Sequence, residues 1–407
     1  MSQEVSALRK AGAALYGILK RISGPALWAG LAIELLIMVI EKSSLVNPYE
    51  GLLFRLTFCL FSVKVLELFC AGRFRKKELA VYAALLLLGV ISWRCSGRNQ
   101  LLRFMMFILA VRGEDNRKVL KAFLFSMISG TAVLAVLSVM GVLGTVTETA
   151  NFDGAVSTRF CFGMGNPNSF QIMIGAIVLL AMVLYGQTCR KFWFAVLFAL
   201  DVLLFILCRS LMGTGLITLS VLWTFLMREQ SERQGAQGAA ELNRRICAVM
   251  KAVFVLGLLF CIAGAIWGLE NPFINWVDSH LMSGRIASIW DFTFHDGTLS
   301  TWTLFGSRLN NRFFDLGWIR VIYWYGVIPA LVILWMTGRL EAVMEKKGDL
   351  YGCMAVIVVS LFTLTEAHFV SEYIGRNYLL VMTAPYLPAI FGIRTAGENT
   401  IPKTETM

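Results

Sequence analysis

The stretch STRFCFGMGNPNSFQIMIGAIVLLAMVLYG, residues 157–186, decides the class of protein to which this chain belongs. From Asn168 to Gly186 it is almost wholly apolar, and its length is close to the roughly 20 residues that a helix needs to cross a membrane. An arginine, several glycines and an Asn-Pro-Asn turn stand directly before the apolar run. The pattern predicts a membrane-spanning helix with a polar, structured entrance.

Similar apolar runs recur along the whole chain. Of its 407 residues, 57% are hydrophobic and 15% are charged, and the mean hydropathy is +0.68. These values predict an all-α, polytopic membrane protein in which residues 1–407 form one transmembrane domain with both termini in the cytoplasm. We expect about twelve spans, at residues 24–41, 50–71, 78–93, 100–112, 118–145, 168–186, 192–208, 211–227, 246–268, 318–337, 350–367 and 374–393. The run at 100–112 is expected to be a short or re-entrant helix, because omitting it would invert every later loop.

The distribution of charge supports this topology and excludes nucleic acid as a partner. The net charge is +11, but the basic clusters, such as RFRKK at 73–77, fall in segments that the topology places inside. Two extracytoplasmic loops are expected, at 146–167 and 269–317, and the longer one should be partly helical. Residues 229–245 are polar and low in complexity, and are expected to form a flexible cytoplasmic linker. No nucleotide-binding, cofactor-binding or metal-ligating motif is visible, so we expect neither a cofactor nor a metal.

The basic residues expected outside are arginines, with Lys42 as the one exception. The planar guanidinium binds phosphate or carboxylate through two parallel hydrogen bonds, whereas lysine acts as a hydrated point charge. The bias therefore suggests an anionic ligand at the outer surface. The alternative is that single arginines reach lipid head groups. The arginines concerned are Arg94, Arg98, Arg103, Arg159, Arg209, Arg285, Arg308, Arg312, Arg320 and Arg376.

The entrance motif fits this interpretation. Asn166, Pro167 and Asn168 are turn and helix-capping residues, so the following helix should begin at the outer surface. Its free amide groups and positive dipole end would then face the same region as Arg159, an arrangement that suits an oxyanion. A capped helix with an unrelated arginine nearby is the alternative.

Other polar residues lie at the same predicted level of the membrane. Arg209 stands in a tight outer hairpin, CRSLMGTG, and Arg285 follows a glycine at the predicted start of a helix in SGRIASIW. At the outer end of the span 350–367, Glu366 or His368 could act as a general base. Alternatively, Glu366 forms a structural ion pair with one of the arginines.

Five ionisable residues are expected within the membrane: Glu34, Arg55, Lys64, Glu67 and Asp201. Lys64 and Glu67 are spaced to pair on one helix face. Such residues would fit a transporter, or the assembly of the helical bundle.

The order of these motifs resembles the O-antigen polymerase and ligase superfamily, the Wzy-like and WaaL-like membrane glycosyltransferases. The resemblance covers about residues 155–393. It rests on the arginine and NPNSF of the entrance motif, CRSLMGTG, SGRIASIW, LFGSRLNNRFFDLGWIRVIYWYGVIPAL and LTEAHFVSEYIGRNYLLVM. The chain has Cys208 where the family more often has a serine. The ligase branch carries a catalytic histidine in its large loop, and neither His280 nor His295 has a matching surrounding sequence, which favours a polymerase.

The resemblance implies a GT-C-like fold and a metal-independent, inverting glycosyl transfer. An undecaprenyl-diphosphate-linked glycan would be the donor and a sugar hydroxyl the acceptor, with Asp315 as an orienting carboxylate and Glu366 or His368 as the base. Arginines would neutralise the diphosphate leaving group. The diphosphate and glycan contacts expected on this basis are Arg159, Asn166, Asn168, Arg209, Arg285 and Arg312.

The resemblance also implies a location and a set of partners. We expect the bacterial cytoplasmic membrane, with the active site facing outside. The expected partners are the lipid-linked glycan and membrane lipid, with a flippase and a chain-length regulator as further candidates. Two alternatives remain: a ligase that transfers glycan to a lipid or wall acceptor, and a transporter of polysaccharide, charged lipid or solute.

Overall fold

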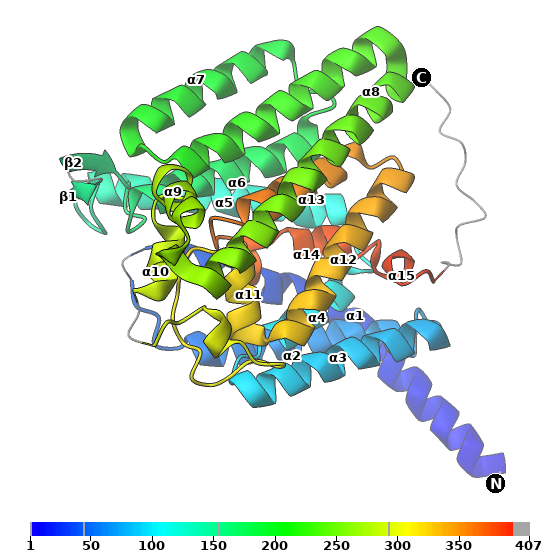
Figure 1. Cartoon of the computed structure of the whole chain (residues 1–407). Helices are drawn as coiled ribbons and strands as arrows, with labels where there is room; N and C mark the ends of the chain where they lie inside the picture. Colours follow the sequence, from blue (N-terminus) through cyan, green and yellow to red (C-terminus); the bar gives the residue numbers. More distant parts are fainter. Residues whose placement is uncertain (1, 44, 153–154, 292–293, 394–407) are drawn as a thin grey trace.

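The computed structural model describes residues 2–43, 45–152, 155–291 and 294–393 (Figure 1). In these ranges the chain is helical apart from one antiparallel hairpin and the connections between elements, as the all-α prediction requires. The longer helices are α1 (Ser2–Lys42), α2 (Glu50–Cys70), α3 (Lys76–Ser96), α4 (Gln100–Val111), α5 (Asn116–Val139), α6 (Pro167–Tyr185), α7 (Lys191–Cys208), α8 (Leu211–Trp267), α12 (Val327–Lys346) and α13 (Leu350–Phe362). The shorter elements are β1 (Thr147–Phe152), β2 (Ala155–Phe160), η1 (Gly268–Glu270), α9 (Pro272–Leu281), α10 (Arg285–Trp290), η2 (Leu299–Thr301), α11 (Gly317–Tyr325), η3 (Ile374–Arg376), α14 (Leu379–Thr383) and α15 (Leu387–Ile390).

Seven helices of the described chain are long and apolar enough to cross a membrane. The count of twelve spans stays a prediction, because the other candidates are short or carry several charges. The helix α4, for example, has 12 residues. At 1.5 Å per residue it measures about 18 Å, well below the roughly 30 Å of a hydrocarbon core, which agrees with the expected short helix. The seven are Tyr16–Lys42, Lys76–Ser96, Asn116–Val139, Pro167–Tyr185, Lys191–Cys208, Leu211–Glu270 and Val327–Lys346.

The start of α6 shows how the local sequence sets a helix boundary. Asn166 is the N-cap, and its side-chain oxygen accepts a hydrogen bond from the amide of Ser169 at 2.7 Å. Pro167 occupies the first helical position, where its missing N–H group is not needed. The apolar residues that follow are largely buried in the central core. The predicted helix 168–186 is confirmed to within a residue at each end.

Residues 229–245 continue α8, so the prediction of a flexible linker is wrong in its conformation. Within α8 the backbone leaves helical geometry at Gly235, where φ is 70° and ψ is −171°, angles that glycine adopts readily. Charged side chains on either side of this glycine pair along the helix, for example Arg228 with Glu232, which stabilises it. The result is a pair of helical arms that fold back at the glycine (Figure 1).

The last predicted span, 374–393, is wrong as a continuous helix. The structure has only the short elements η3, α14 and α15 in this range. Pro385 and Pro388 each lack an amide hydrogen and disfavour helical geometry at the residue before them. Pro385 lies between α14 and α15, and Pro388 is in the first turn of α15. Both short helices stay packed in the core through residues such as Val381 and Leu387.

The connections between helices gather at two opposite ends of the bundle (Figure 1). The strands β1 and β2 lie with α9 and α10 at one end, which we call the hairpin end. The bend of α8 and the helix α15 lie at the other, which we call the bend end. Arg75 and the first residues of α3 line a hollow there together with Phe391. This separation agrees with the predicted alternation of inner and outer loops.

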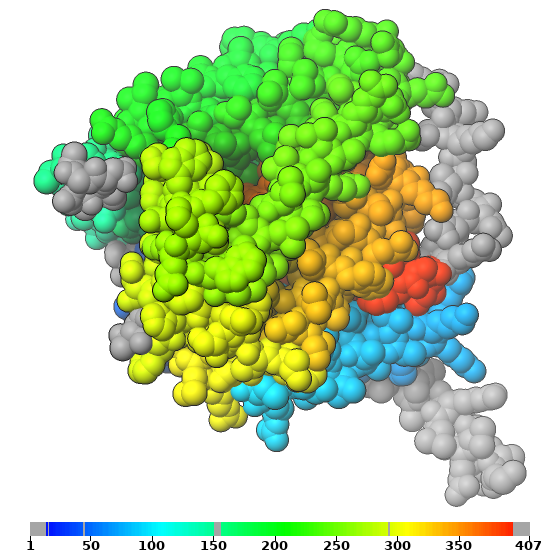
Figure 2. All heavy atoms as spheres, in the orientation of Figure 1, coloured from blue at the N-terminus to red at the C-terminus, as the bar shows by residue number. Residues whose placement is uncertain are grey.

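The loop 269–317 is partly helical, as expected, and it is packed against the bundle. Figure 2 shows its yellow-green and yellow atoms in contact with an arm of α8 and with α12. A second apolar core joins Ile286 of α10 to Cys261 of α8. The indole nitrogen of Trp290 donates a hydrogen bond to the main-chain oxygen of Gly264 at 2.9 Å. The loop is therefore a fixed cover at the hairpin end.

Candidate functional site

A charged cavity of about 400 Å³ lies at the hairpin end. Its walls come from the end of α1, the β1–β2 hairpin, the start of α6, the segment before α11 and the connection that follows α13. These segments are far apart in the sequence, and each is one that the predicted topology places outside. The charged residues in its lining are Glu41, Lys42, Glu148, Arg159, Asp315, Glu366 and Arg376.

The predicted entrance motif forms one wall of this cavity. Arg159 lies on β2 opposite Glu148 of β1 in the hairpin register, and both residues line the cavity. Asn166 and Asn168 line it as well, at the first turn of α6. In that turn Pro167 has no amide hydrogen and Asn166 caps the amide of Ser169. The amide of Asn168 and the positive dipole end of the helix therefore remain for a ligand. The structure thus brings Arg159 and a helix N-terminus together, as the sequence predicted.

Glu366 lies beyond the end of α13 at Phe362, in the connection that lines the cavity. Arg285, the first residue of α10, forms an ion pair with its carboxylate and donates to the main-chain oxygen of Thr365 at 2.5 Å. Burial, followed by the negative charge of Asp315, raises the pKa of Glu366 to about 7, while Arg285 acts in the opposite direction. The ion pair that the sequence left as an alternative is therefore present, and the carboxyl group still titrates near neutral pH.

His368 lies two residues further along the same connection. It is buried, and within the described part of the chain its Nε2 atom has no hydrogen-bond partner. Burial, followed by the positive charge of Lys42, lowers the pKa of His368 well below its ordinary value, so the ring is neutral at pH 7. A neutral imidazole whose Nε2 atom has no partner can donate a hydrogen bond to a ligand in the cavity or accept one from it, depending on the tautomer.

Four charged residues of the described lining were not among the predicted contacts: Glu41, Lys42, Glu148 and Arg376. Lys42, the one lysine among the basic residues expected outside, is the last residue of α1 and lines the cavity. Beside it, Glu41 forms an ion pair with Arg376. The sequence contained a signal for Lys42, because it broke the arginine pattern. Nothing in the sequence indicated that the end of α1 meets the connection after α13.

Three of the predicted contacts are outside the described lining of the charged cavity: Arg285, which reaches it only through its ion pair with Glu366, and Arg209 and Arg312, which lie elsewhere. Arg209 is exposed at the end of α7, with left-handed backbone angles of φ 52° and ψ 38°. Arg312 is also exposed, and its Nε atom lies 3.6 Å from Oδ2 of Asp296. Neither belongs to the described lining of the charged cavity. The predicted reversal at Arg209 is present between α7 and α8, but the sequence does not show that the side chain at this turn is exposed and lies outside the cavity.

Several of the arginines expected outside form hydrogen bonds or ion pairs with other parts of this chain. Arg320 is fully buried and donates to the main-chain oxygens of Ala367 and Val370. Arg98 forms an ion pair with Glu372 at 2.6 Å. Arginine suits this task because its donors can satisfy several acceptors while the group stays charged in a dry environment. The arginine bias is therefore partly structural, a third explanation beside ligand binding and contact with head groups.

Arg103, deeper in the bundle, likewise binds a carboxylate and a main-chain oxygen of the protein. Its guanidinium pairs with the fully buried carboxylate of Glu34 at 2.7 Å and donates to the main-chain oxygen of Glu372 at 3.1 Å. It also lies 3.5 Å from the centroid of the Phe54 ring. These contacts tie α1, α2 and α4 to the connection that carries Glu366. Arg103 therefore supports the charged cavity without lining its described surface.

Comparison with protein-family models, with curated proteins and with solved structures finds no match to this chain. Among the described residues, no group of three or more His, Cys, Asp or Glu side chains is placed to hold a metal ion. The function is therefore inferred from the geometry of the charged cavity and from the sequence motifs that line it.

Proposed function

We propose that this chain is a membrane glycosyltransferase that polymerises undecaprenyl-diphosphate-linked repeat units into a surface polysaccharide of the O-antigen, capsule or exopolysaccharide type. The observation that carries the proposal is the charged cavity, where cationic groups and a carboxyl group that titrates near pH 7 meet at one end of an apolar helical bundle. An anionic leaving group and an acid–base pair are what this transfer requires.

The leaving group would be held by the wall that contains Arg159. The guanidinium, the ammonium of Lys42 and the N-terminus of α6 all line the same cavity. Together they offer bidentate hydrogen bonds, a point charge and the positive end of a helix dipole to the two phosphates. This arrangement stabilises the negative charge that develops as the diphosphate leaves, without requiring a divalent cation.

The acceptor would be activated at the wall that contains Glu366. A sugar hydroxyl oxygen attacks the anomeric carbon of the donor, and the bond from that carbon to the diphosphate breaks. The hydroxyl proton passes to the Glu366 carboxylate, and the diphosphate departs with the bonding electron pair. A base whose pKa lies near the working pH is well matched to this task. His368 would hydrogen-bond the acceptor sugar, and Asp315 would keep the pKa of Glu366 high.

The ionisable residues of the bundle interior favour a transferase over a transporter. A transporter is expected to line a path through the middle of the membrane with such groups. Here Lys64 pairs with Glu67 at 3.2 Å and with Glu114 at 3.0 Å, while Asp201 accepts a hydrogen bond from Thr218 at 2.6 Å. These contacts hold helices together, and none of these residues is in the described lining of the charged cavity.

A location in the bacterial cytoplasmic membrane, with the hairpin end outside, belongs to the same proposal. Its support is the gathering of basic segments around the bend end, as the positive-inside rule requires of a cytoplasmic face. Donor and acceptor glycans would then reach the charged cavity from outside.

The test uses the full chain in membrane vesicles, with a lipid-linked repeat unit as the only added substrate. Arg159→Lys keeps a positive charge but loses the planar fork, and Arg308→Lys, at an exposed site outside the described lining, is the matched control. We expect the wild type and the control to form a ladder of lengthened chains, and Arg159→Lys to form a tenfold smaller amount, about the value of one charge-assisted hydrogen bond. A single transfer to a lipid acceptor would indicate a ligase, and movement of intact substrate across the vesicle membrane would indicate a transporter.

A further inference from the structure

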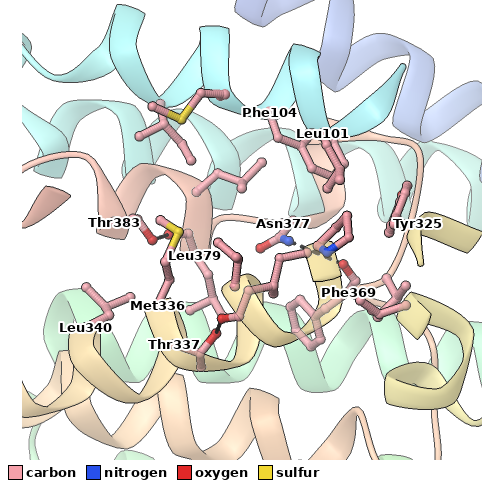
Figure 3. Close-up of a pocket in the computed structure, with 18 of the residues that line it drawn as sticks. Leu101, Phe104, Tyr325, Met336, Thr337, Leu340, Phe369, Asn377, Leu379 and Thr383 are labelled. Atoms are coloured by element: carbon pink, nitrogen blue, oxygen red, sulfur yellow. Dashed lines mark hydrogen bonds between the residues drawn. The ribbon is translucent and has the colours of Figure 1, made fainter. Parts of the chain in front are cut away.

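A second cavity, of about 230 Å³, lies inside the helical bundle (Figure 3). Its walls come from α3, α4, α11, α12, α13 and α14, and we call it the apolar cavity. Along α12 the lining runs from Pro329 to Leu340, about 16 Å at 1.5 Å per residue. This is about half of the roughly 30 Å hydrocarbon core of a bilayer. The cavity is therefore as deep as one leaflet.

The polar side chains along the body of this cavity are turned away from it. The hydroxyl groups of Thr337, Ser360, Thr363 and Thr383 each donate to a main-chain oxygen one turn earlier in the sequence. This back-bonding uses their donors and leaves an apolar surface toward the cavity. No charged residue is found in the part of the lining that the structure describes. The body of the cavity suits a hydrocarbon chain.

Two polar atoms at one end are left without partners. Tyr325 is 2% exposed, and its hydroxyl has no hydrogen-bond partner among the described residues. Asn377 donates its amide to the main-chain oxygen of Phe369 at 3.3 Å, and its buried Oδ1 atom is equally without a partner in the described chain. In Figure 3 both residues lie toward Phe369, with Leu340 at the opposite end. Buried polar atoms are normally paired, so these two indicate a missing polar group.

We propose that the apolar cavity binds a long-chain lipid alcohol from the membrane, with its chain along α12 and its hydroxyl between Tyr325 and Asn377. A hydroxyl supplies one donor and two acceptor lone pairs. It can accept from the Tyr325 hydroxyl and donate to the Oδ1 atom of Asn377, which satisfies both orphaned atoms. No cation belongs to the described lining, although Arg98, Arg103 and Arg320 act on Tyr325 from behind it, so a phosphate-headed competitor is needed to distinguish an alcohol from an anion.

This binding goes beyond the proposed glycan transfer and does not depend on it. The two cavities nevertheless share a wall, the connection that follows α13. Glu366 and His368 line the charged cavity, whereas Phe369 and Ser371 line the apolar cavity. A bound alcohol would therefore contact the far side of the segment that carries the proposed base.

The test is photolabelling of the full chain in lipid nanodiscs. The probe is dodecan-1-ol with a diazirine in the middle of its chain, and the competitors are dodecan-1-ol, dodecane and dodecyl phosphate. We expect labelled peptides from α4, α12 and α13. We also expect the alcohol to compete about tenfold better than the alkane, the difference that one or two buried hydrogen bonds produce. Dodecyl phosphate should compete more weakly than the alcohol.

Variants locate the two parts of the site. Tyr325→Phe keeps the ring but removes one of the two proposed hydrogen bonds, so it should reduce the preference for the alcohol over the alkane severalfold. Tyr323→Phe, on the same helix but bound to Asp296 and outside the described lining, should keep the preference. Ile333→Trp fills the body of the cavity and should abolish labelling while the melting temperature is retained. Labelling outside the cavity, no preference for alcohol over alkane in the wild type, or stronger competition by dodecyl phosphate would each overturn the proposal.

Discussion

The charged cavity and the apolar cavity lie on either side of one connection, but they differ in how the polar side chains of their walls are used. At the charged cavity Glu366 and His368 present ionisable groups to an open space. Along the apolar cavity Ser360 and Thr363 return their hydroxyls to the main chain, so that methyl and methylene groups form the surface. One short, irregular segment therefore separates a site for polar ligands from a site for apolar ones.

The arginines show a similar division. Arg320 and Arg103 are buried and donate to main-chain oxygens of the connection, whereas Arg159 lines an open cavity. The first kind should matter for stability and the second for turnover. Substitutions that separate these two effects test the whole interpretation.

The largest effect is expected for Glu366→Gln. The amide oxygen can still accept from Arg285, but the side chain can no longer take a proton. Turnover, measured as release of polyprenyl diphosphate from a lipid-linked glycan, should fall by about 10²–10⁴-fold, the usual contribution of a general base. The melting temperature should change little.

Glu372→Gln is the matched control for that variant. Glu372 lies on the same connection and pairs with Arg98, but it is outside the described lining of the charged cavity. Its turnover should stay within a fewfold of the wild type. If both variants lose activity equally, the connection is needed for its shape, and Glu366 is not the base.

The next largest effect is a loss of stability in Glu34→Ala. Glu34 is fully buried, accepts from Thr57 at 2.6 Å and pairs with Arg103 at 2.7 Å. Its removal leaves a buried guanidinium without its counter-ion, which should lower the free energy of unfolding in detergent by about 3–5 kcal/mol. The double variant with Glu34→Leu and Arg103→Met should regain most of this stability. Equal stability of Glu34→Ala and the wild type would contradict a structural role for this pair.

The pH dependence of turnover should identify the base independently. Only the ionised carboxylate accepts a proton, so activity should fall as the pH drops below the pKa of Glu366, which is about 7. The negative charge of Asp315 raises that pKa, so Asp315→Asn should lower it and move the acidic limb of the profile to lower pH. Asp291→Asn, at an exposed position, should leave the limb in place. If Asp315→Asn leaves the acidic limb of the profile at the same pH as in the wild type, Glu366 is excluded as the group whose protonation causes that limb.

Much of the fold could be predicted, because apolar runs and caps are local features. The boundaries of α6 and α7 follow from hydropathy and from the residues that flank each run. The hairpin was not predicted, although an Asp-Gly pair, typical of hairpin turns, stands at 153–154 between two strand-like runs. The span at 374–393 was wrong because hydropathy outweighed its two prolines, whose effect on helical geometry is visible in the sequence.

The candidate site could be predicted only in part. Arg159, Asp315, Glu366 and His368 do meet in one cavity, because topology brings all outer segments to the same end. The partners of the other arginines could not be predicted, since many of them are main-chain oxygens, which every residue carries. Lys42 was missed for a different reason: the sequence marked it as the exception to the arginine pattern, but its place in the cavity depends on how the end of α1 packs.

The smallest effect is expected for Arg209→Gly, which tests whether sequence order or geometry better identifies a contact. Arg209 has the left-handed backbone that glycine adopts without strain, and it ends α7. The variant should raise the free energy of unfolding by up to about 1 kcal/mol, because left-handed geometry disfavours a side chain. Its turnover should remain within twofold of the wild type. A tenfold loss of turnover in a stable variant would instead place Arg209 on the substrate, and the substrate would then have to reach from the charged cavity past the start of α6 to the end of α7.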